Sequence, residues 1–281
     1  MMHNNSRLDR RTVLRTAAGL SCGAIAGCAG DDSEATTRTP ADGDATPPGQ
    51  DTLERVAVDG TTLVVELTAD AEVDWVNLIW PSGELFGRRD VPAGVQQVTF
   101  ELGTSYDPGE YRLLALQGEE TVVETSLEIR PELEIRDMGV FRNTPEKPWD
   151  EVYGESETDA LKNGEAFVTV ENTGTGPEAV VELSFSGDVP NPIEDPNGSG
   201  MHEKESVKIG PGETVDAYSG TFPFGPNLSE EGMGCSIAGN TGRVTVAVES
   251  KVTGQAITSQ FGVEYTGSEK MRDCEITFTE V

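Results

Sequence analysis

The chain has 281 residues, of which 20 are lysine or arginine and 50 are aspartate or glutamate, giving a formal net charge of −30. A polyanion would be repelled by this charge, which argues against nucleic acid or an anionic membrane surface as a direct partner. The same charge destabilises a compact state in dilute buffer, because like charges repel until salt screens them.

The first 27 residues have the pattern of an export signal. Arg10 and Arg11 precede an apolar stretch over residues 16–26, and Ala26 and Gly27 supply small residues at its end. Paired arginines, a short apolar region and a small-residue cleavage site are typical of a twin-arginine signal peptide. The apolar stretch is shorter than the roughly 20 residues of a membrane-spanning helix, so we expect a cleaved signal.

The residues around the expected cleavage site, Ile25-Ala26-Gly27-Cys28, resemble the lipobox of exported lipoproteins. The resemblance implies cleavage before Cys28 and attachment of lipid to its sulfur, which would hold the protein at the extracellular face of the cell membrane. An ordinary signal peptide would also accept these small residues, so the cysteine itself carries the distinction. The acidic, lysine-poor composition resembles that of proteins from salt-loving archaea, in which concentrated salt screens the repulsion.

Residues 28–51 are expected to form a disordered tether. After Cys28 they hold no aliphatic or aromatic side chain larger than alanine, and threonine, proline and aspartate are frequent. Such a composition buries too little apolar surface to offset the entropy of folding.

Residues 52–130 predict a first β-sandwich, because short β-rich runs alternate with turn signals. Residues 62–68 and 124–129 alternate apolar and polar side chains, as strands buried on one face do. The strands are expected at residues 53–58, 61–68, 73–80, 95–102, 109–117 and 121–129, with a weaker one at 84–91.

Residues 107–111, which read Asp-Pro-Gly-Glu-Tyr, resemble the tyrosine corner of immunoglobulin-like domains. The resemblance implies that the Tyr111 hydroxyl bonds back to upstream backbone, and that Trp75 or Trp80 is buried from the strand they share. No cysteine flanks either tryptophan, so the inter-sheet disulfide of antibody domains is not expected. This fold hosts many functions and implies none.

Residues 131–281 predict a second, larger β-sandwich. A strand at 167–172 runs into Glu-Asn-Thr-Gly, and Pro-Gly-Glu-Thr follows at 211–214. These motifs resemble the CARDB-type and related adhesion-like immunoglobulin folds of archaeal and bacterial surface proteins, although insertions at about 142–164 and 186–204 interrupt the pattern. We therefore expect an all-β chain of two tandem immunoglobulin-like antiparallel β-sandwiches.

Cys235 and Cys274 remain in the exported part, where disulfides form. Neither has a neighbouring histidine or second cysteine at metal-ligand spacing, so a structural bridge is favoured over a metal site or a reactive thiol pair. Closing a loop of roughly 40 residues is worth about 3 to 4 kcal/mol on the chain-entropy model.

His202 is the only histidine of the exported part, which excludes a multi-histidine zinc site or a blue-copper centre within one chain. No Gly-x-Ser-x-Gly elbow accompanies it, so a serine nucleophile is not expected. The sequence contains no phosphate-binding glycine loop, dinucleotide fingerprint or cysteine cluster, and we expect no cofactor. A catalytic carboxylate pair cannot be told from an acidic surface, and this alternative stays open.

The loop at 186–204 carries weak candidates for calcium ligands, although their spacing departs from the EF-hand pattern. The candidates are Asp188, Glu194, Asp195 and Asn197. Asn197 and Asn227 also begin possible N-glycosylation sequons. Aromatic residues in loop contexts, Trp149, Tyr153, Phe222 and Phe224, are expected to serve packing rather than a binding face.

We expect a non-catalytic surface lipoprotein that presents loops to a protein or glycan partner. One alternative is a ligand- or calcium-binding accessory protein of a transporter or extracellular enzyme. Another is a hydrolase with two carboxyl groups roughly 5 to 9.5 Å apart in a pocket.

Overall fold

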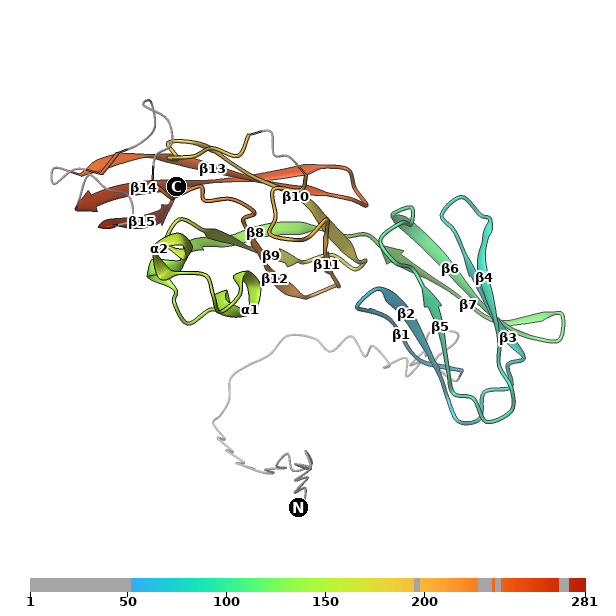
Figure 1. Cartoon of the computed structure of the whole chain (residues 1–281). Coiled ribbons are helices and arrows are strands. Elements are labelled where there is room, and N and C mark those ends of the chain that lie inside the picture. The colour runs from blue at the N-terminus through green and yellow to red at the C-terminus, as the bar shows by residue number, and fades with distance from the viewer. Residues whose placement is uncertain (1–51, 195–197, 227–233, 236–238, 268–272) are drawn as a thin grey trace, which may run out of the picture. The chain divides into compact units, whose positions relative to one another are not determined.

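A computed structural model describes residues 52–194, 198–226, 234–235, 239–267 and 273–281 (Figure 1). The expected signal peptide and tether lie outside the described residues, and so does the expected lipid-attachment residue, Cys28. Asp195, Asn197 and Asn227 also lie outside them.

The first sandwich pairs a three-stranded sheet with a four-stranded sheet. Its strands are β1 (Leu53–Asp59), β2 (Thr62–Leu67), β3 (Trp75–Ile79), β4 (Leu85–Asp90), β5 (Gln97–Glu101), β6 (Gly109–Gln117) and β7 (Glu120–Ile129). The sheet orders are β1-β2-β5 and β4-β3-β6-β7, with all neighbours antiparallel. Every strand expected in this segment is present, and the predicted all-β, immunoglobulin-like fold class is confirmed.

Strict alternation places the core of the first sandwich. In β6, Tyr111, Leu113 and Ala115 are fully buried while their neighbours are exposed or half-buried. Successive side chains of a strand point to opposite faces, so these three face the other sheet. There they belong to the same buried cluster as Leu63 and Val65 of β2.

The tyrosine corner is present. Tyr111 is fully buried, and its hydroxyl donates a hydrogen bond of 2.9 Å to the backbone carbonyl of Asp107. Trp80, just beyond the end of β3, packs against the Tyr111 ring with centroids 5.6 Å apart. Trp75 and Trp80 are both half-buried, so neither tryptophan is fully buried as expected, and the Arg88 guanidinium lies 3.8 Å from the Trp75 ring centroid.

The second sandwich pairs a three-stranded sheet with a five-stranded sheet. Its strands are β8 (Leu133–Val140), β9 (Ala166–Asn172), β10 (Glu178–Gly187), β11 (Val207–Ile209), β12 (Thr214–Tyr218), β13 (Asn240–Ser250), β14 (Ala256–Gly267) and β15 (Cys274–Glu280). The sheet orders are β12-β9-β8 and β11-β10-β13-β14-β15, again antiparallel. A separate buried cluster, which includes Val168, Phe185 and Val246, fills this sandwich.

The insertion between β8 and β9 contains helices that the sequence pattern did not predict. A 3₁₀ turn (Phe141–Asn143) is followed by α1 (Trp149–Tyr153) and α2 (Asp159–Lys162). The side chain of Trp149 is 1% exposed and packs edge-on against Phe167 of β9 and Tyr218 of β12. Helices this short are not stable alone, so burial of Trp149 holds α1 against the sheet (Figure 1).

Two buried polar residues organise turns in the second sandwich. Asn172 donates from Nδ2 to the carbonyls of Gly176 and Ile209, and its Oδ1 accepts from the backbone N–H of Glu132 and Gly174. These four bonds give a structural reason for asparagine in the Glu-Asn-Thr-Gly motif.

Glu178 is fully buried, and its carboxylate accepts hydrogen bonds from the backbone N–H groups of Ala179, Val252 and Thr253. It therefore fixes the turn between β13 and β14.

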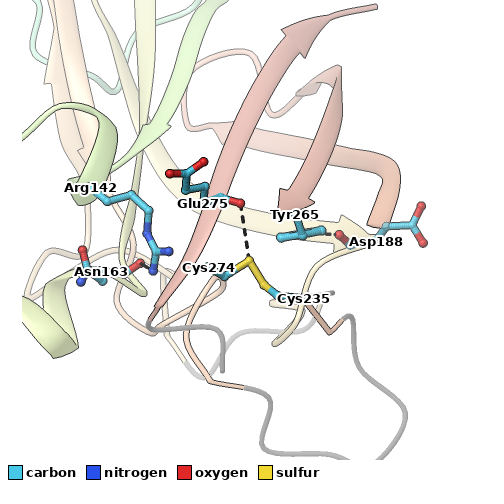
Figure 2. Close-up of a disulfide and its surroundings, with 7 residues drawn as sticks. All are labelled: Arg142, Asn163, Asp188, Cys235, Tyr265, Cys274 and Glu275. Atoms are coloured by element: carbon cyan, nitrogen blue, oxygen red, sulfur yellow. Dashed lines mark hydrogen bonds between the residues drawn. A yellow bond between two sulfur atoms is a disulfide. The ribbon is translucent and has the colours of Figure 1, made fainter. Parts of the chain in front are cut away.

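The predicted bridge between Cys235 and Cys274 is confirmed, with Cα atoms 6.0 Å apart (Figure 2). Cys274 begins β15, so the bridge ties the 235 segment to the end of the five-stranded sheet. Beside it, the Tyr265 hydroxyl donates to the carbonyl of Asp188 at 2.7 Å (Figure 2).

Candidate functional site

A cleft of about 370 Å³ opens beside strand β12 of the second sandwich. Three segments form it: the start of α1, the segment 201–207, and β12. Its lining combines apolar and charged side chains, namely Pro148, Glu151, Val152, Met201, His202, Glu203, Lys204, Val207, Asp216 and Tyr218. The volume lies at the lower end of the range of small-ligand sites.

Helix α1 supplies one wall. Trp149 is inserted between α1 and the sheet, and its indole N–H donates to the Thr144 carbonyl at 2.7 Å. With Trp149 held inward, Glu151 and Val152 line the cleft. The wall is therefore positioned by a buried aromatic anchor.

The segment 201–207 supplies a second wall. Met201 forms an isolated antiparallel bridge with Ser219, and the His202 N–H donates to the Tyr218 carbonyl at 2.9 Å. The next residue, Glu203, has a backbone φ of 47°, which residues other than glycine rarely adopt. The chain turns there and leaves β12, and the His202 ring lies 4.3 Å from the Tyr153 ring.

Tyr218 differs from the other four tyrosines of the chain. Tyr106, Tyr111, Tyr153 and Tyr265 each donate their hydroxyl to a backbone carbonyl, at 2.7 to 3.1 Å. The Tyr218 hydroxyl oxygen is buried and has no hydrogen-bond partner within the described part of the chain. Buried polar groups normally have partners, so this one marks an unsatisfied position at the cleft.

The field at the cleft is negative. The Asp216 carboxylate accepts from Lys147 at 2.5 Å and from the Thr169 hydroxyl at 2.6 Å. Burial raises the pKa of Tyr218 to about 12, and the charges of Asp216 and Glu151 add to this rise. Glu151, Glu203 and Lys204 are exposed, and none of them forms an ion pair with another described residue.

Glu165 lies close behind this region but does not line the cleft. Its side chain is 3% exposed, and burial, with the nearby charge of Glu157, raises its pKa to about 8. A raised carboxyl pKa is a property of general acids. Because Glu165 does not line the cleft, we assign it no part in ligand binding there.

Of the residues singled out in the sequence, His202 is brought to the cleft. Asp188 instead accepts the backbone N–H of Arg243 at 2.8 Å, and Glu194 is exposed. Among the residues with described positions, no three His, Cys, Asp or Glu side chains lie together as metal ligands.

The loop aromatics serve packing in part. Trp149 and Phe224 are buried, Tyr153 is half-buried, and Phe222 is 38% exposed. Reasoning from sequence missed Tyr218, Glu151 and Met201 as cleft residues. In the described ranges no helix is both long and apolar enough to cross a membrane.

No protein-family model matches the chain, and no curated protein matches it. Solved structures with similarity include a two-domain fibronectin type III segment of chicken tenascin, at 14% identity and a TM-score of 0.27, covering 75% of this chain and 98% of that one. A biofilm-associated protein BSP domain matches at 12% identity and a TM-score of 0.24, over 78% of this chain and 32% of that one.

A β-glucuronidase of glycoside hydrolase family 2 matches at 12% identity and a TM-score of 0.22, over 73% of this chain. The chain spans less than a quarter of the length of the glycoside hydrolase structures that it matches. Similarity at these TM-scores gives no information about function.

Proposed function

We propose that the protein is a non-catalytic binding module, held at the extracellular face of the cell membrane by lipid on Cys28, with its ligand site in the cleft beside β12. The observation that carries the binding role is Tyr218. It is the tyrosine whose buried hydroxyl lacks a partner among the described residues, and it lines a cleft with an apolar floor and a charged rim. Clefts of this composition are the usual form of ligand sites.

The export signal supports the location. Arg10 and Arg11 with the Ile-Ala-Gly-Cys sequence at 25–28 are what a lipid-anchored exported protein requires. The acidic surface fits an envelope bathed in concentrated salt, where the repulsion among the carboxylates of the exported chain is screened. A protein or glycan outside the membrane is then the accessible class of partner.

The location is tested by fractionation of cells that express the full chain. Cys28→Ser removes the lipid attachment, so the variant should appear in the medium while the wild type stays with the membrane. Cys22→Ser is the matched control, because Cys22 lies inside the signal and is discarded. Retention of Cys28→Ser on membranes would contradict the anchor.

The binding role is tested by thermal unfolding in concentrated KCl with a panel of amines, neutral sugars and carboxylates. A ligand that binds the folded state raises the melting temperature with its concentration. The melting temperature of the wild type should rise with ligands of one class, and the double variant Glu151→Lys/Glu203→Lys should change that rise. A wild type unaffected by every class would contradict a ligand site in the cleft.

A further inference from the structure

We propose that the cleft receives a lysine or arginine side chain of an extended segment of a partner protein, and that this segment pairs with the open edge of β12. The inference rests on the proposed function, since it names the ligand of the same cleft. Charge, shape and the free strand edge each point to this occupant.

The charge of the rim favours a cation. Glu151, Glu203 and Asp216 line the cleft against one lysine, Lys204, and Asp216 is already paired with Lys147. Two exposed carboxylates thus line the cleft, one from α1 and one from the 201–207 segment, with no cation paired to them among the residues described. A ligand carboxylate would be repelled by the pair, and an ammonium or guanidinium group would be attracted.

The floor favours an aliphatic stem below that charge. Val152 of α1 meets Met201 and Val207 of the 201–207 segment at the cleft, together with Tyr218 of β12. Lysine and arginine lay their methylene stems on apolar surface while the charged head stays at the polar rim. A cation beside an aromatic ring also gains attraction from the ring face. A long basic side chain matches both the floor and the rim.

The edge of β12 favours a peptide over a free amine. β12 is the outer strand of the β12-β9-β8 sheet. Among the described residues, its outer side is covered at its end, where Met201 bridges Ser219, His202 donates to Tyr218 and Gly220 donates to Gly200. The backbone turn at Glu203 ends this pairing. Main-chain groups alternate along a strand, so the N–H and C=O of Asp216, two residues before Tyr218, face the same edge.

No described residue pairs with the outer edge at Asp216. An extended peptide added there would gain main-chain hydrogen bonds from the edge and specificity from the side chain in the adjacent cleft. This is the usual division of roles in β-strand addition.

The test is a selection of displayed random heptapeptides on the intact exported protein, in KCl sufficient to keep it folded, with counter-selection against Glu151→Lys/Glu203→Lys. Both glutamates are exposed, so the variant should fold, and its melting curve checks that it does. Recovered peptides should share a lysine or arginine flanked by β-branched residues.

The selected peptide is then titrated by calorimetry. Replacing its basic residue by norleucine should weaken binding roughly tenfold, Glu151→Lys/Glu203→Lys should weaken it by at least as much, and each single glutamine variant by roughly twofold to fivefold. Glu205→Lys is the matched control, because Glu205 is exposed in the same segment but does not line the cleft; its affinity should stay within about twofold. N-methylation of the peptide amide next to the basic residue should abolish pairing with the edge.

The other outcomes overturn the inference in distinguishable ways. Peptides enriched in acidic residues, or a neutral sugar that stabilises the protein where no peptide binds, would refute the basic side chain and leave a binding cleft. Free cadaverine that competes as well as the peptide would refute the strand pairing. A wild type that neither enriches peptides nor responds to any class of small ligand would refute the proposed function itself.

Discussion

The tyrosine corner of the first sandwich and the cleft of the second are each organised around a tyrosine on a strand, yet only one of the two hydroxyls is used. Tyr111 is fully buried and donates to the Asp107 carbonyl. Tyr218 buries its hydroxyl oxygen without a partner among the described residues and lines an open cleft. The Tyr111 hydroxyl therefore has its hydrogen-bond partner within the fold, whereas the Tyr218 hydroxyl has none among the described residues.

The difference separates a hydroxyl that stabilises the fold from one that folding leaves without a partner among the described residues. A buried hydroxyl without a partner costs about 1 to 3 kcal/mol, and folding alone gives no reason to keep it. A similar contrast holds between two buried carboxyls of the second sandwich. Glu178 accepts three backbone N–H groups, while Oε2 of Glu165 has no partner among the residues described.

The largest expected effect comes from the bridge that only the second sandwich carries. Replacing both Cys235 and Cys274 by serine should lower the free energy of unfolding by about 4 kcal/mol, because the unfolded chain regains the entropy of a long loop. Denaturant melts followed by tryptophan fluorescence would measure it. The unfolding transition of the first sandwich, which contains Trp80, should stay at the same denaturant concentration. A loss of stability in that transition would show that the two sandwiches do not unfold separately.

The next effect separates the two buried carboxyls. Glu178→Ala should cost about 3 kcal/mol, since Ala179, Val252 and Thr253 would lose a charged acceptor for their backbone N–H groups. Chemical denaturation measures the loss, and hydrogen exchange at Val252 and Thr253 should speed up with it. Unchanged exchange at the β13–β14 turn would contradict the assigned role.

Glu165 should act through pH. Its folded pKa of about 8 lies above its ordinary value of 4.5, so between these values the folded state holds a proton that the unfolded state releases. Stability from this group is complete below pH 4.5 and is lost as pH rises through 8. Melts of the wild type and Glu165→Gln at pH 5 and pH 8 should show a smaller pH dependence in the variant; equal dependence would contradict it.

The smallest effects sharpen the tyrosine contrast itself. Tyr111→Phe should cost about 1 kcal/mol by removing a formed hydrogen bond. Tyr218→Phe should leave the free energy of unfolding unchanged or raise it, because no formed bond is lost and a buried hydroxyl without a partner is removed. The two variants remove the same atom and are matched controls for each other, measured by the same denaturant melt. Equal losses would mean that Tyr218 has a partner in the folded protein.

Local patterns predicted the scaffold well and the cleft poorly. The alternating burial on β6, the Asp-x-Gly-x-Tyr sequence at the start of β6 and the exported cysteine pair each depend on neighbours in sequence or on simple chemistry. Helix α1 was missed because its stability comes from burial of Trp149 against distant strands, not from helix propensity.

The cleft was missed for a related reason. Its walls come from segments near residues 150, 203 and 217, which are far apart in the sequence. Nothing in the sequence around Tyr218 indicates that its hydroxyl lacks a partner among the described residues. His202 is the only histidine of the expected exported chain, but its place beside Tyr153 depends on the 201–219 bridge. Non-local pairing thus decides the site, while local pattern decides the strands.

The most direct test of the binding cleft uses His202 as a reporter, because it is the only histidine of the expected exported chain and lines the cleft. The selected peptide is titrated while the imidazole signals are followed by NMR, with the indole signal of Trp80 beside the tyrosine corner as the internal control. We predict a saturable shift of the His202 signals with the calorimetric affinity and an unchanged Trp80 signal. Full binding by calorimetry with the His202 signals unmoved would place the ligand elsewhere and contradict the account.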